Sequence, residues 1–420
     1  MPIRSASDSI PSAKLTSSGQ PLVSAIVSTY NDERFIRGCM ESLTRQTIAD
    51  LMEIIVVVSG STEREVHIVR EFEERAGNIT CLRTAQREGL YTAWNRAIRL
   101  ARGRYVANHN TDDRLHPLAY ERMASALEAF PDVALVYCDC LQTQGENETF
   151  ESTSSREPYQ TTQDHCLYDL LRFCYIGPFP MWRRSLHDEL GGFDEDFVSG
   201  ADYEFWLRVA ARHKLMRVRE TLGLFLNRDS SLSHLQRGYD ESLSIIRRAR
   251  RTVPLDAVFP ALKSANDPAA EGMAWAAMAE LCVTGPWLAE YDLALHFLEQ
   301  AERHGAPALL IQNNRAVFRA LDGDLAGAAQ GFERCLPHPT AQANLVWLRQ
   351  FAEHLERRHR LAAMPNSAEA DAPAPQPRII LAQHPVVDDA RRKFGVDPKD
   401  IPPLRRTARI GAPSVPCQAL

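Results

Sequence analysis

The sequence lacks the features of several specialised protein classes. It has no apolar run approaching the roughly 20 residues that span a bilayer, and its first residues lack the charged and apolar regions of a signal peptide. Its formal net charge of -6 argues against nucleic acid as the main partner. We therefore expect a cytoplasmic protein that has no transmembrane segment and binds no nucleic acid.

Spaced cysteine pairs are absent as well. The 9 cysteines are scattered from Cys39 to Cys417 without the spacing of a zinc site or a disulfide framework, so we expect reduced thiols. With 45% hydrophobic and 24% charged residues, the composition is that of an ordinary globular protein. A length of 420 residues exceeds one compact core and suggests two or three units of about 150 residues each.

Strand and helix patterns alternate from about Leu22 onwards. Val23–Thr29 is a continuous, mostly apolar run, and the next apolar residues, from Phe35 to Leu43, recur at helical spacing. The alternation continues with strands expected at Glu53–Val58, Ile79–Arg83 and Arg104–Asn108, and with helices at Glu63–Arg75 and Tyr91–Ala101. Strands separated by helices predict an α/β fold with a mostly parallel sheet.

Polar loops follow three of these strands. They read Thr29-Tyr30-Asn31-Asp32-Glu33, Ser59-Gly60-Ser61-Thr62 and His109-Asn110-Thr111-Asp112-Asp113. Ligands of parallel sheets bind beyond the carboxyl ends of the strands. We therefore expect the three loops to meet at one rim of the sheet and to form the binding site.

Both ends of the chain differ from this pattern. Residues 1–20 are rich in Ser, Pro and Gly and are expected to be a flexible leader. Beyond Met364 the chain becomes Pro- and Ala-rich and then basic, so residues 365–420 are expected to be a largely irregular tail with short docking segments.

A helical region precedes the tail. From about Ser242 to Arg358 the sequence is rich in Ala, Leu and Arg and has no strand pattern. Glu290, Ala294, Leu298 and Ala301 recur 34 positions later as Asp324, Ala328, Phe332 and Cys335, which is the period of tetratricopeptide repeats; a generic helical bundle is the alternative. The basic run Arg247–Arg251 either is a solvated helix face or touches the inner face of a membrane.

Two acidic motifs are candidates for chemistry. Asn110-Thr111-Asp112-Asp113 ends a strand, and hard cations such as magnesium bind one or two carboxylates together with substrate phosphates, so Asp112 is the candidate metal ligand; the alternative is a plain turn. Asp202 lies at an expected helix start. It is the candidate base that takes the proton of an attacking hydroxyl, and the alternative is a helix cap.

The motifs together resemble the family 2 glycosyltransferases from about Pro21 to about His234. They are Pro21–Ser24 through Tyr30-Asn31, Gln46-Thr47, Glu53–Val57, Gly60-Ser61-Thr62, Ala93-Trp94-Asn95, Ala101–Tyr105, Asp112-Asp113 and Gly191–Glu195 with Asp202. The resemblance implies a GT-A fold over residues 21–240, with a DXD-type site for a divalent cation, Mg²⁺ or Mn²⁺. It also implies inverting transfer from a nucleotide-diphosphate sugar. Residues 241–364 would then be an appended tetratricopeptide-like domain.

The resemblance also assigns roles by position. The donor-binding candidates are Thr29, Tyr30, Asn31, Glu33, Ser59, Asn95, Asn110 and Thr111. Asp112 is then the metal ligand and Asp202 the base. Asp113 is a further candidate, as are Arg228 and His234, which fall where the family closes a loop over the diphosphate.

Three positions depart from the family pattern. Val58 stands where the family commonly has an aspartate that reads the base, which leaves guanosine and thymidine donors open beside uridine. Asn110 replaces the first acid of the metal motif, and Ala201 replaces the acid before the base. These departures support an alternative hypothesis, in which a non-catalytic scaffold binds a partner through its helical repeats.

The acceptor has no readable signature in the sequence. Residues 141–182 are expected to build its pocket, and a polysaccharide, a lipid-linked glycan and a protein all remain candidates. Stacked helix pairs form concave peptide-binding surfaces, so a protein partner of the helical repeats is also a candidate.

Overall fold

The structure is a computed structural model that describes residues 20–159, 163–228, 236–284, 288–362 and 376–404. The chain divides into two compact units. Among the described residues, the sheet unit contains 20–165, 174–242 and 393–404, and the helical unit contains 166–173 and 243–392. Two short segments therefore fall outside the contiguous ranges expected from the sequence.

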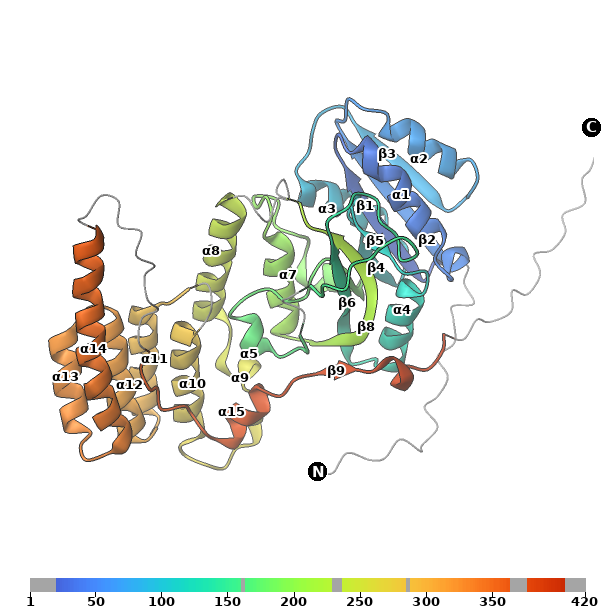
Figure 1. The fold of residues 1–420 in the computed structure, drawn as a ribbon. Helices are drawn as coiled ribbons and strands as arrows, with labels where there is room; N and C mark the ends of the chain where they lie inside the picture. The colour runs from blue at the N-terminus through green and yellow to red at the C-terminus, as the bar shows by residue number, and fades with distance from the viewer. Residues whose placement is uncertain (1–19, 160–162, 229–235, 285–287, 363–375, 405–420) are drawn as a thin grey trace, which may run out of the picture. The chain divides into compact units, whose positions relative to one another are not determined.

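The sheet unit is built on one mixed sheet (Figure 1). Its strands are β1 Val23–Thr29, β2 Met52–Ser59, β3 Ile79–Thr84, β4 Tyr105–Asn108, β5 Arg114–Leu115, β6 Val133–Thr143, β7 Pro180–Arg183, β8 Lys214–Leu226 and β9 Gly395–Val396. Their order is β3-β2-β1-β4-β7-β6-β8-β5, and β9 pairs with β8. The first four strands pair in parallel, as predicted, whereas β7 is antiparallel to both of its neighbours, so the whole sheet is mixed.

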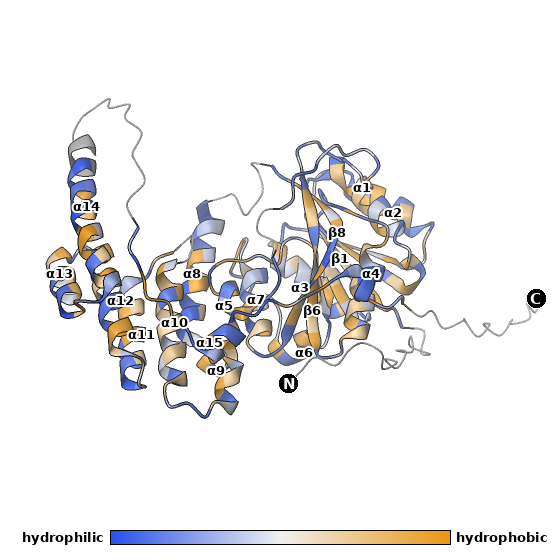
Figure 2. Cartoon of the chain, turned by 60° about the horizontal axis from the view of Figure 1, so that its bottom comes forward, coloured by the Kyte–Doolittle hydropathy of each residue, from blue (hydrophilic) through white to orange (hydrophobic). Residues whose placement is uncertain are grey.

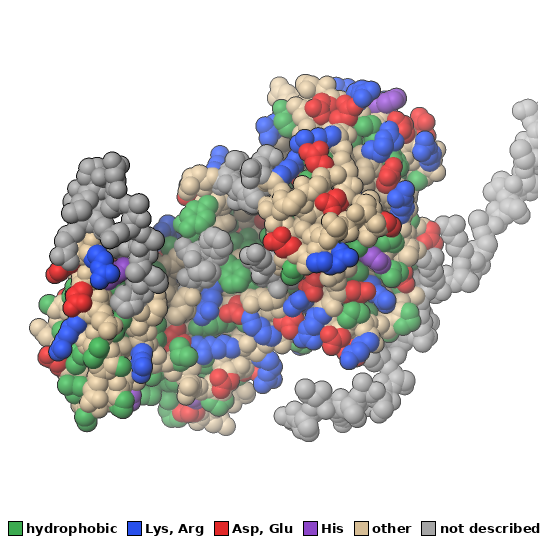
Figure 3. Space-filling view, viewed as in Figure 1, with side chains coloured by type: hydrophobic (Ala, Val, Ile, Leu, Met, Phe, Trp, Pro, Cys, Tyr) green, Lys and Arg blue, Asp and Glu red, His purple; other side chains and the backbone are tan. Residues whose placement is uncertain are grey.

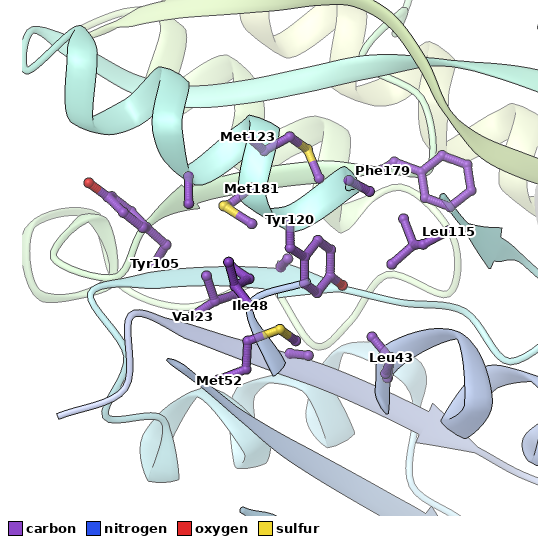
Figure 4. Close-up of a cluster of buried hydrophobic side chains, with 14 of the residues drawn as sticks. Val23, Leu43, Ile48, Met52, Tyr105, Leu115, Tyr120, Met123, Phe179 and Met181 are labelled. Carbon is purple, nitrogen blue, oxygen red and sulfur yellow. The ribbon is translucent and has the colours of Figure 1, made fainter. Parts of the chain in front are cut away.

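Helices cover both faces of this sheet. They are α1 Glu33–Thr44, α2 Glu65–Glu73, α3 Leu90–Leu100, α4 Ala119–Ala129, α6 Leu186–Leu190 and α7 Ala201–Ala210, with a 3-10 turn, η1, at Ala49–Leu51. Alternate residues of β1 point to opposite faces, and Val23, Ala25 and Val27 share one core cluster with α1, α2 and α4. Figure 4 shows part of that cluster, with Tyr120 and Met123 of α4 among side chains from the strands. The apolar strands stand out in Figure 2.

The helical unit contains helices only within its described residues. They are α5 Leu167–Leu170, the larger part of α8 Gln236–Thr252, α9 Leu255–Val258, the 3-10 helix η3 Pro260–Ser264, α10 Ala270–Thr284, α11 Tyr291–Arg303, α12 Ala308–Leu321, α13 Leu325–Arg334, α14 Pro339–Ala362 and α15 Pro385–Ala390. From α10 to α14 each helix packs against the next one in the chain. Glu290 and Asp324 are the N-cap residues of α11 and α13, and of the two only the side chain of Asp324 accepts a hydrogen bond from its own helix, from the N–H of Gly327.

The late segment is more ordered than the largely irregular tail expected from the sequence. It forms α15, β9 and the 3-10 turn η4 Pro398–Asp400 within residues 376–404. Val386 and Val387 are buried in the helical unit, whereas Val396 and Ile401 join the core cluster of the sheet unit. The segment is ordered because these apolar side chains are buried, even though the surrounding sequence is rich in Pro and Ala.

The basic run is not a fully solvated helix face. Arg250 is buried and forms an ion pair with Glu290, and Arg251 pairs with the same carboxylate.

On the face seen in Figure 3, acidic and basic side chains are interspersed. Within the described ranges no helix is both long and apolar enough to span a bilayer, and the cysteines there are free thiols.

Candidate active site

A cleft opens beyond the carboxyl ends of β1 and β4. Its volume is about 360 Å³, within the range of ligand-binding pockets. Asp112 and Asp202, which are 90 positions apart in the sequence, both line it. Its other polar lining residues include Ser28, Asp32, Tyr91, Asn108, Asn110, Thr111, Ser199, Tyr203 and Arg228.

Two carboxylates from different loops converge on one cation in this cleft. The Nε atom of Arg228 lies 2.8 Å from Oδ2 of Asp112, and its Nη1 atom lies 3.6 Å from Oδ1 of Asp32. Asp32 follows β1, and Asp112 follows β4. The hydroxyl of Thr111 donates a hydrogen bond of 2.8 Å to Asp32, which joins the two loops. The cleft thus holds two acids and a guanidinium within ion-pair distance.

Burial is the main influence on the pKa of Asp112. Loss of solvent raises the pKa of the Asp112 carboxyl, the charge of Arg228 opposes this change, and the nearby charge of Asp32 adds to it. Any further cation that approached these two acids would favour their ionised forms. The pair is therefore suited to bind positive charge.

Asp113 faces away from the cleft and organises the loop. Its carboxylate accepts hydrogen bonds from the backbone N–H of Leu226, at 3.1 Å, and from the side-chain amide of Asn110, at 2.9 Å. Burial, followed by the charge of Asp112, raises the pKa of Asp113 well above its ordinary value. Asp113 thus fixes the turn that presents Asp112, while Asn110 and Thr111 themselves line the cleft.

Asp202 has one oxygen held by the protein and one oxygen left for a ligand. The hydroxyl of Tyr91 and the backbone N–H of Tyr203 donate to Oδ1, at 3.1 Å and 2.8 Å. Among the described residues, none donates a hydrogen bond to Oδ2. Burial raises the pKa of the Asp202 carboxyl, and the two hydrogen bonds oppose this rise. The result is a carboxylate in a fixed orientation with increased affinity for a proton.

Asn95 supports this part of the site from behind. Its side-chain amide binds both the N–H and the carbonyl of Phe193, at 2.9 Å and 2.8 Å, and donates to Glu195 at 2.9 Å. These contacts hold the Gly191–Glu195 loop on α3. Asn95 is buried and does not line the cleft, so the structure places this donor-binding candidate in a supporting position.

In the first polar loop Asp32 lines the cleft, whereas Asn31 and Glu33 lie outside it. Asn31 adopts φ of 51°, a left-handed conformation that asparagine tolerates. Its side-chain oxygen accepts hydrogen bonds from Ser61 and from the backbone N–H of Thr62, both at 3.0 Å. Glu33 is engaged by Arg64. Asn31 and Glu33 line a separate surface hollow between α1 and α2 and not the cleft.

The remaining donor-binding candidates also have partners or positions outside the cleft. Tyr30 is 37% exposed, and the guanidinium of Arg87 lies 4.2 Å from the centre of its ring. Ser59 is buried and exchanges hydrogen bonds with the backbone of Glu88. Thr29 is buried, and its hydroxyl has no hydrogen-bond partner in the described residues. His234 lies outside the described residues.

Asp32 and Tyr91 are among the cleft residues to which the sequence analysis assigns no role. Asp32 lies in the first polar loop beside the donor-binding candidates, and Tyr91 is the expected start of a helix. The signal that identifies them is spatial, because Asp32 contacts Arg228 and Tyr91 contacts Asp202 across more than 100 positions of chain. For Asp32, its place directly after β1 was the available hint.

Known proteins are similar to the sheet unit. Residues 24–191 match the family described as Glycosyl transferase family 2. The chain is 26% identical over 222 residues to "Uncharacterized glycosyltransferase MJ1057" of Methanocaldococcus jannaschii, which covers 52% of this chain and 76% of that protein. It is 29% identical over 244 residues to "Uncharacterized glycosyltransferase EpsJ" of Bacillus subtilis, which covers 53% and 69%.

Among solved structures, S. aureus TarS is similar with a TM-score of 0.47 and 16% identity, covering 71% of this chain and 55% of that chain. The family match includes the loops that hold Asp32 and Asp112, and it ends before Asp202 and Arg228. Residues 24–191 are therefore similar to the glycosyltransferases of family 2.

Proposed function

We propose that the sheet unit transfers a sugar, with inversion, from a nucleotide-diphosphate sugar to a hydroxyl group of an acceptor. The observation that carries this proposal is the shared cleft of Asp112 and Asp202. The cleft offers two acids and an arginine, which suit a diphosphate and its cation. It also offers a carboxylate with a raised pKa and an oxygen available to a ligand.

Asp202 is proposed as the general base. Its Oδ2 takes the proton of the acceptor hydroxyl while the acceptor oxygen forms a bond to the anomeric carbon. The bond from that carbon to the phosphate oxygen breaks in the same step, and the nucleoside diphosphate leaves with the electron pair. Attack on the face opposite the leaving group inverts the anomeric configuration. Tyr91 keeps Oδ1 occupied and so directs Oδ2 to the substrate.

Arg228, Asp112 and Asp32 are proposed to receive the diphosphate. The guanidinium of Arg228 can bind phosphate oxygens through paired N–H groups. The described residues contain no group of three or more His, Cys, Asp or Glu side chains placed to hold a metal ion. Mg²⁺ and Mn²⁺ at phosphates need only one or two carboxylates, and Arg228 already acts as a cation between two, so Asp112 and Asp32 fit the role. A bound divalent cation would neutralise the charge of the leaving diphosphate.

The finer assignments are also proposals. The nucleotide is uridine, guanosine or thymidine diphosphate, and the acceptor is a polysaccharide, a lipid-linked glycan or a protein. The helices α10–α14 are proposed to be degenerate tetratricopeptide-like repeats that bind a protein partner, which their consecutive packing and the 34-residue period support. The location proposed from composition is the cytoplasm; pairing of Arg250 and Arg251 with Glu290 leaves less free charge for a membrane surface.

A panel of nucleotide sugars tests the proposal directly. We expect the purified protein to release nucleoside diphosphate from one of them with Mn²⁺ or Mg²⁺ present, and Asp202→Asn to abolish this release while the protein still binds the donor. Calorimetry with nucleoside diphosphates and Mn²⁺ provides the second measurement. Absence of binding for all of them would favour the non-catalytic scaffold instead.

A further inference from the structure

Three helices of the helical unit share an unusual feature, a buried polar side chain that binds the backbone of another segment. Glu280 of α10 is 1% exposed, and Asn314 of α12 and Asn344 of α14 are both 0% exposed. Asparagine is a poor residue for a helix interior, and a buried amide without partners is costly. These positions therefore call for a polar partner.

The partner in the structure is the extended stretch 378–382. Asn344 donates to the carbonyl of Arg378 at 2.9 Å and accepts from its N–H at 2.8 Å. Asn314 binds Ile380 in the same way, with both hydrogen bonds at 2.8 Å. Glu280 accepts from the N–H of Ala382. Each of the three side chains thus forms hydrogen bonds with the main chain of one residue, and the bound residues alternate along the segment: 378, 380 and 382.

The first spacing between these three residues equals the 34-residue period, and the second is four residues shorter. Glu280 and Asn314 are 34 positions apart, and Asn344 follows 30 positions later. They lie on α10, α12 and α14, so that every second helix supplies one rung (Figure 1). Alternate residues of an extended chain are about 6.6 Å apart and point to one side. A repeated helical surface thus presents a ladder with the register of a β-strand. We call Glu280, Asn314 and Asn344 the ladder.

The side-chain nitrogen and oxygen of Asn314 and of Asn344 all have hydrogen-bond partners. Asn344 also donates to the side-chain oxygen of Asn313 at 2.9 Å, and Asn313 donates to that of Asn314 at 3.1 Å. These secondary contacts fix the orientation of both amides. The ladder is therefore preorganised for a peptide backbone, whichever chain supplies it.

The bound stretch is held mainly by its backbone. Arg378 is exposed, and Leu381, which points away from the ladder, is 52% exposed. The adjoining helix α15 has its own attachment, since Val386 and Val387 are buried. Release of residues 378–382 would therefore leave α15 attached. Ala382 is buried and leaves room only for a small side chain, whereas the exposed side chains of Arg378 and Leu381 do not restrict the sequence at their positions.

We propose that the ladder is a binding site for the main chain of an extended polypeptide, filled in cis by residues 378–382 and filled in trans by an extended segment of a partner protein. The proposal specifies the partner site suggested above for the helices, and it does not depend on sugar transfer. A tethered segment competes at a high effective concentration, so a partner binds only when it displaces that segment.

A labelled peptide with the sequence of residues 376–384 provides the test. In the full-length protein, Ile380→Pro removes the N–H that binds Asn314, whereas Leu381→Pro changes an adjacent residue whose N–H does not contact the ladder. We expect fluorescence anisotropy to show about tenfold tighter peptide binding to Ile380→Pro than to Leu381→Pro or the natural protein. Adding Asn314→Ala to Ile380→Pro should abolish this gain. Equal affinities of the two proline variants would mean that the ladder is only an anchor.

Hydrogen exchange of the natural protein covers the case in which Ile380→Pro does not fold. Saturating unlabelled peptide should speed deuterium uptake in residues 378–382 several-fold, because the displaced amides become exposed to solvent. A peptide with proline at the position of Ile380 should have no such effect. Unchanged uptake with the first peptide would overturn the proposal. Neither measurement requires a donor sugar, so a failed transferase assay leaves the result interpretable.

Discussion

The cleft of the sheet unit and the ladder of the helical unit treat buried polar groups in opposite ways. In the ladder, every atom of the Asn314 and Asn344 side-chain amides that can form a hydrogen bond has a partner. In the cleft, Asp202 keeps an oxygen without a donor, and the side-chain oxygen of Asn108 has no partner among the described residues. Proteins seldom leave such groups unsatisfied. The difference indicates that the ladder is occupied and that the cleft is prepared for a ligand.

The largest expected effect is at Asp202, the proposed general base. Asp202→Asn should lower the transfer rate by about 10³-fold, since a positioned general base contributes roughly 10² to 10⁴. The neutral amide has a similar shape, so the melting temperature should stay within a few degrees of that of the natural protein. Asp196→Asn, at an exposed position near α7, makes the same change in charge and should leave the rate unchanged. A rate near normal for Asp202→Asn would remove Asp202 from the mechanism.

The second effect is at the acidic pair. Asp112→Asn should reduce transfer by about 100-fold, because the leaving diphosphate loses part of the charge that holds its cation. Titration with Mn²⁺ should show a higher concentration requirement than in the natural protein, and Asp196→Asn again serves as the control. If the variant required no more Mn²⁺ than the natural protein, Asp112 would not be a metal ligand.

The third effect is a change in the free energy of unfolding when a residue of the ladder is replaced. Asn314→Ala leaves the N–H and carbonyl of Ile380 without partners, so we expect a loss of about 1–3 kcal/mol in the free energy of unfolding. Gln312→Ala removes an amide from an exposed position on the same helix and should cost less than about 0.5 kcal/mol. Urea unfolding measures both. Equal costs would show that the contacts to residues 378–382 contribute little.

The smallest effect is at Tyr91. Its hydrogen bond stabilises the charged form of Asp202, so Tyr91→Phe should raise the pKa of Asp202 further. A general base works when it is deprotonated, so under the proposed mechanism activity should be lost as the pH falls through that pKa. The acid limb of the profile of kcat/KM against pH should therefore move to higher pH, with a decrease of about three- to tenfold at pH values near the limb. A limb that moved to lower pH would contradict this account.

The first half of the sheet could be predicted from the sequence because its signals are local. Apolar runs and helical spacing predicted β1 to β4 and the intervening helices within a few residues. The partners of the cleft residues could not be predicted, because the contact of Tyr91 with Asp202 joins residues 111 positions apart. The antiparallel insertion of β7 between β4 and β6 is likewise a property of the assembled sheet.

The ladder shows the same limit in the helical unit. Asn313 and Asn314 read as ordinary polar residues of a helix, and their meaning depends on a segment 66 positions further along. The composition of that segment predicted irregular structure, which is correct for its lack of helix and strand at residues 376–384. Composition could not show that an irregular backbone is held in one place by side chains from three helices.

The pairing of β9 with β8 means that a fragment that contains only the first part of the chain lacks one strand of the sheet. β5 pairs with β8 at Gly223 and Leu224, and β9 pairs with it at Arg217 and Val218. A fragment ending at Ser242 would leave that stretch of strand edge uncovered and would lose the apolar contact of Val396 with the core. Open strand edges promote aggregation. The sheet unit is therefore not a contiguous piece of sequence, and its solubility as a fragment depends on residues about 150 positions beyond Ser242.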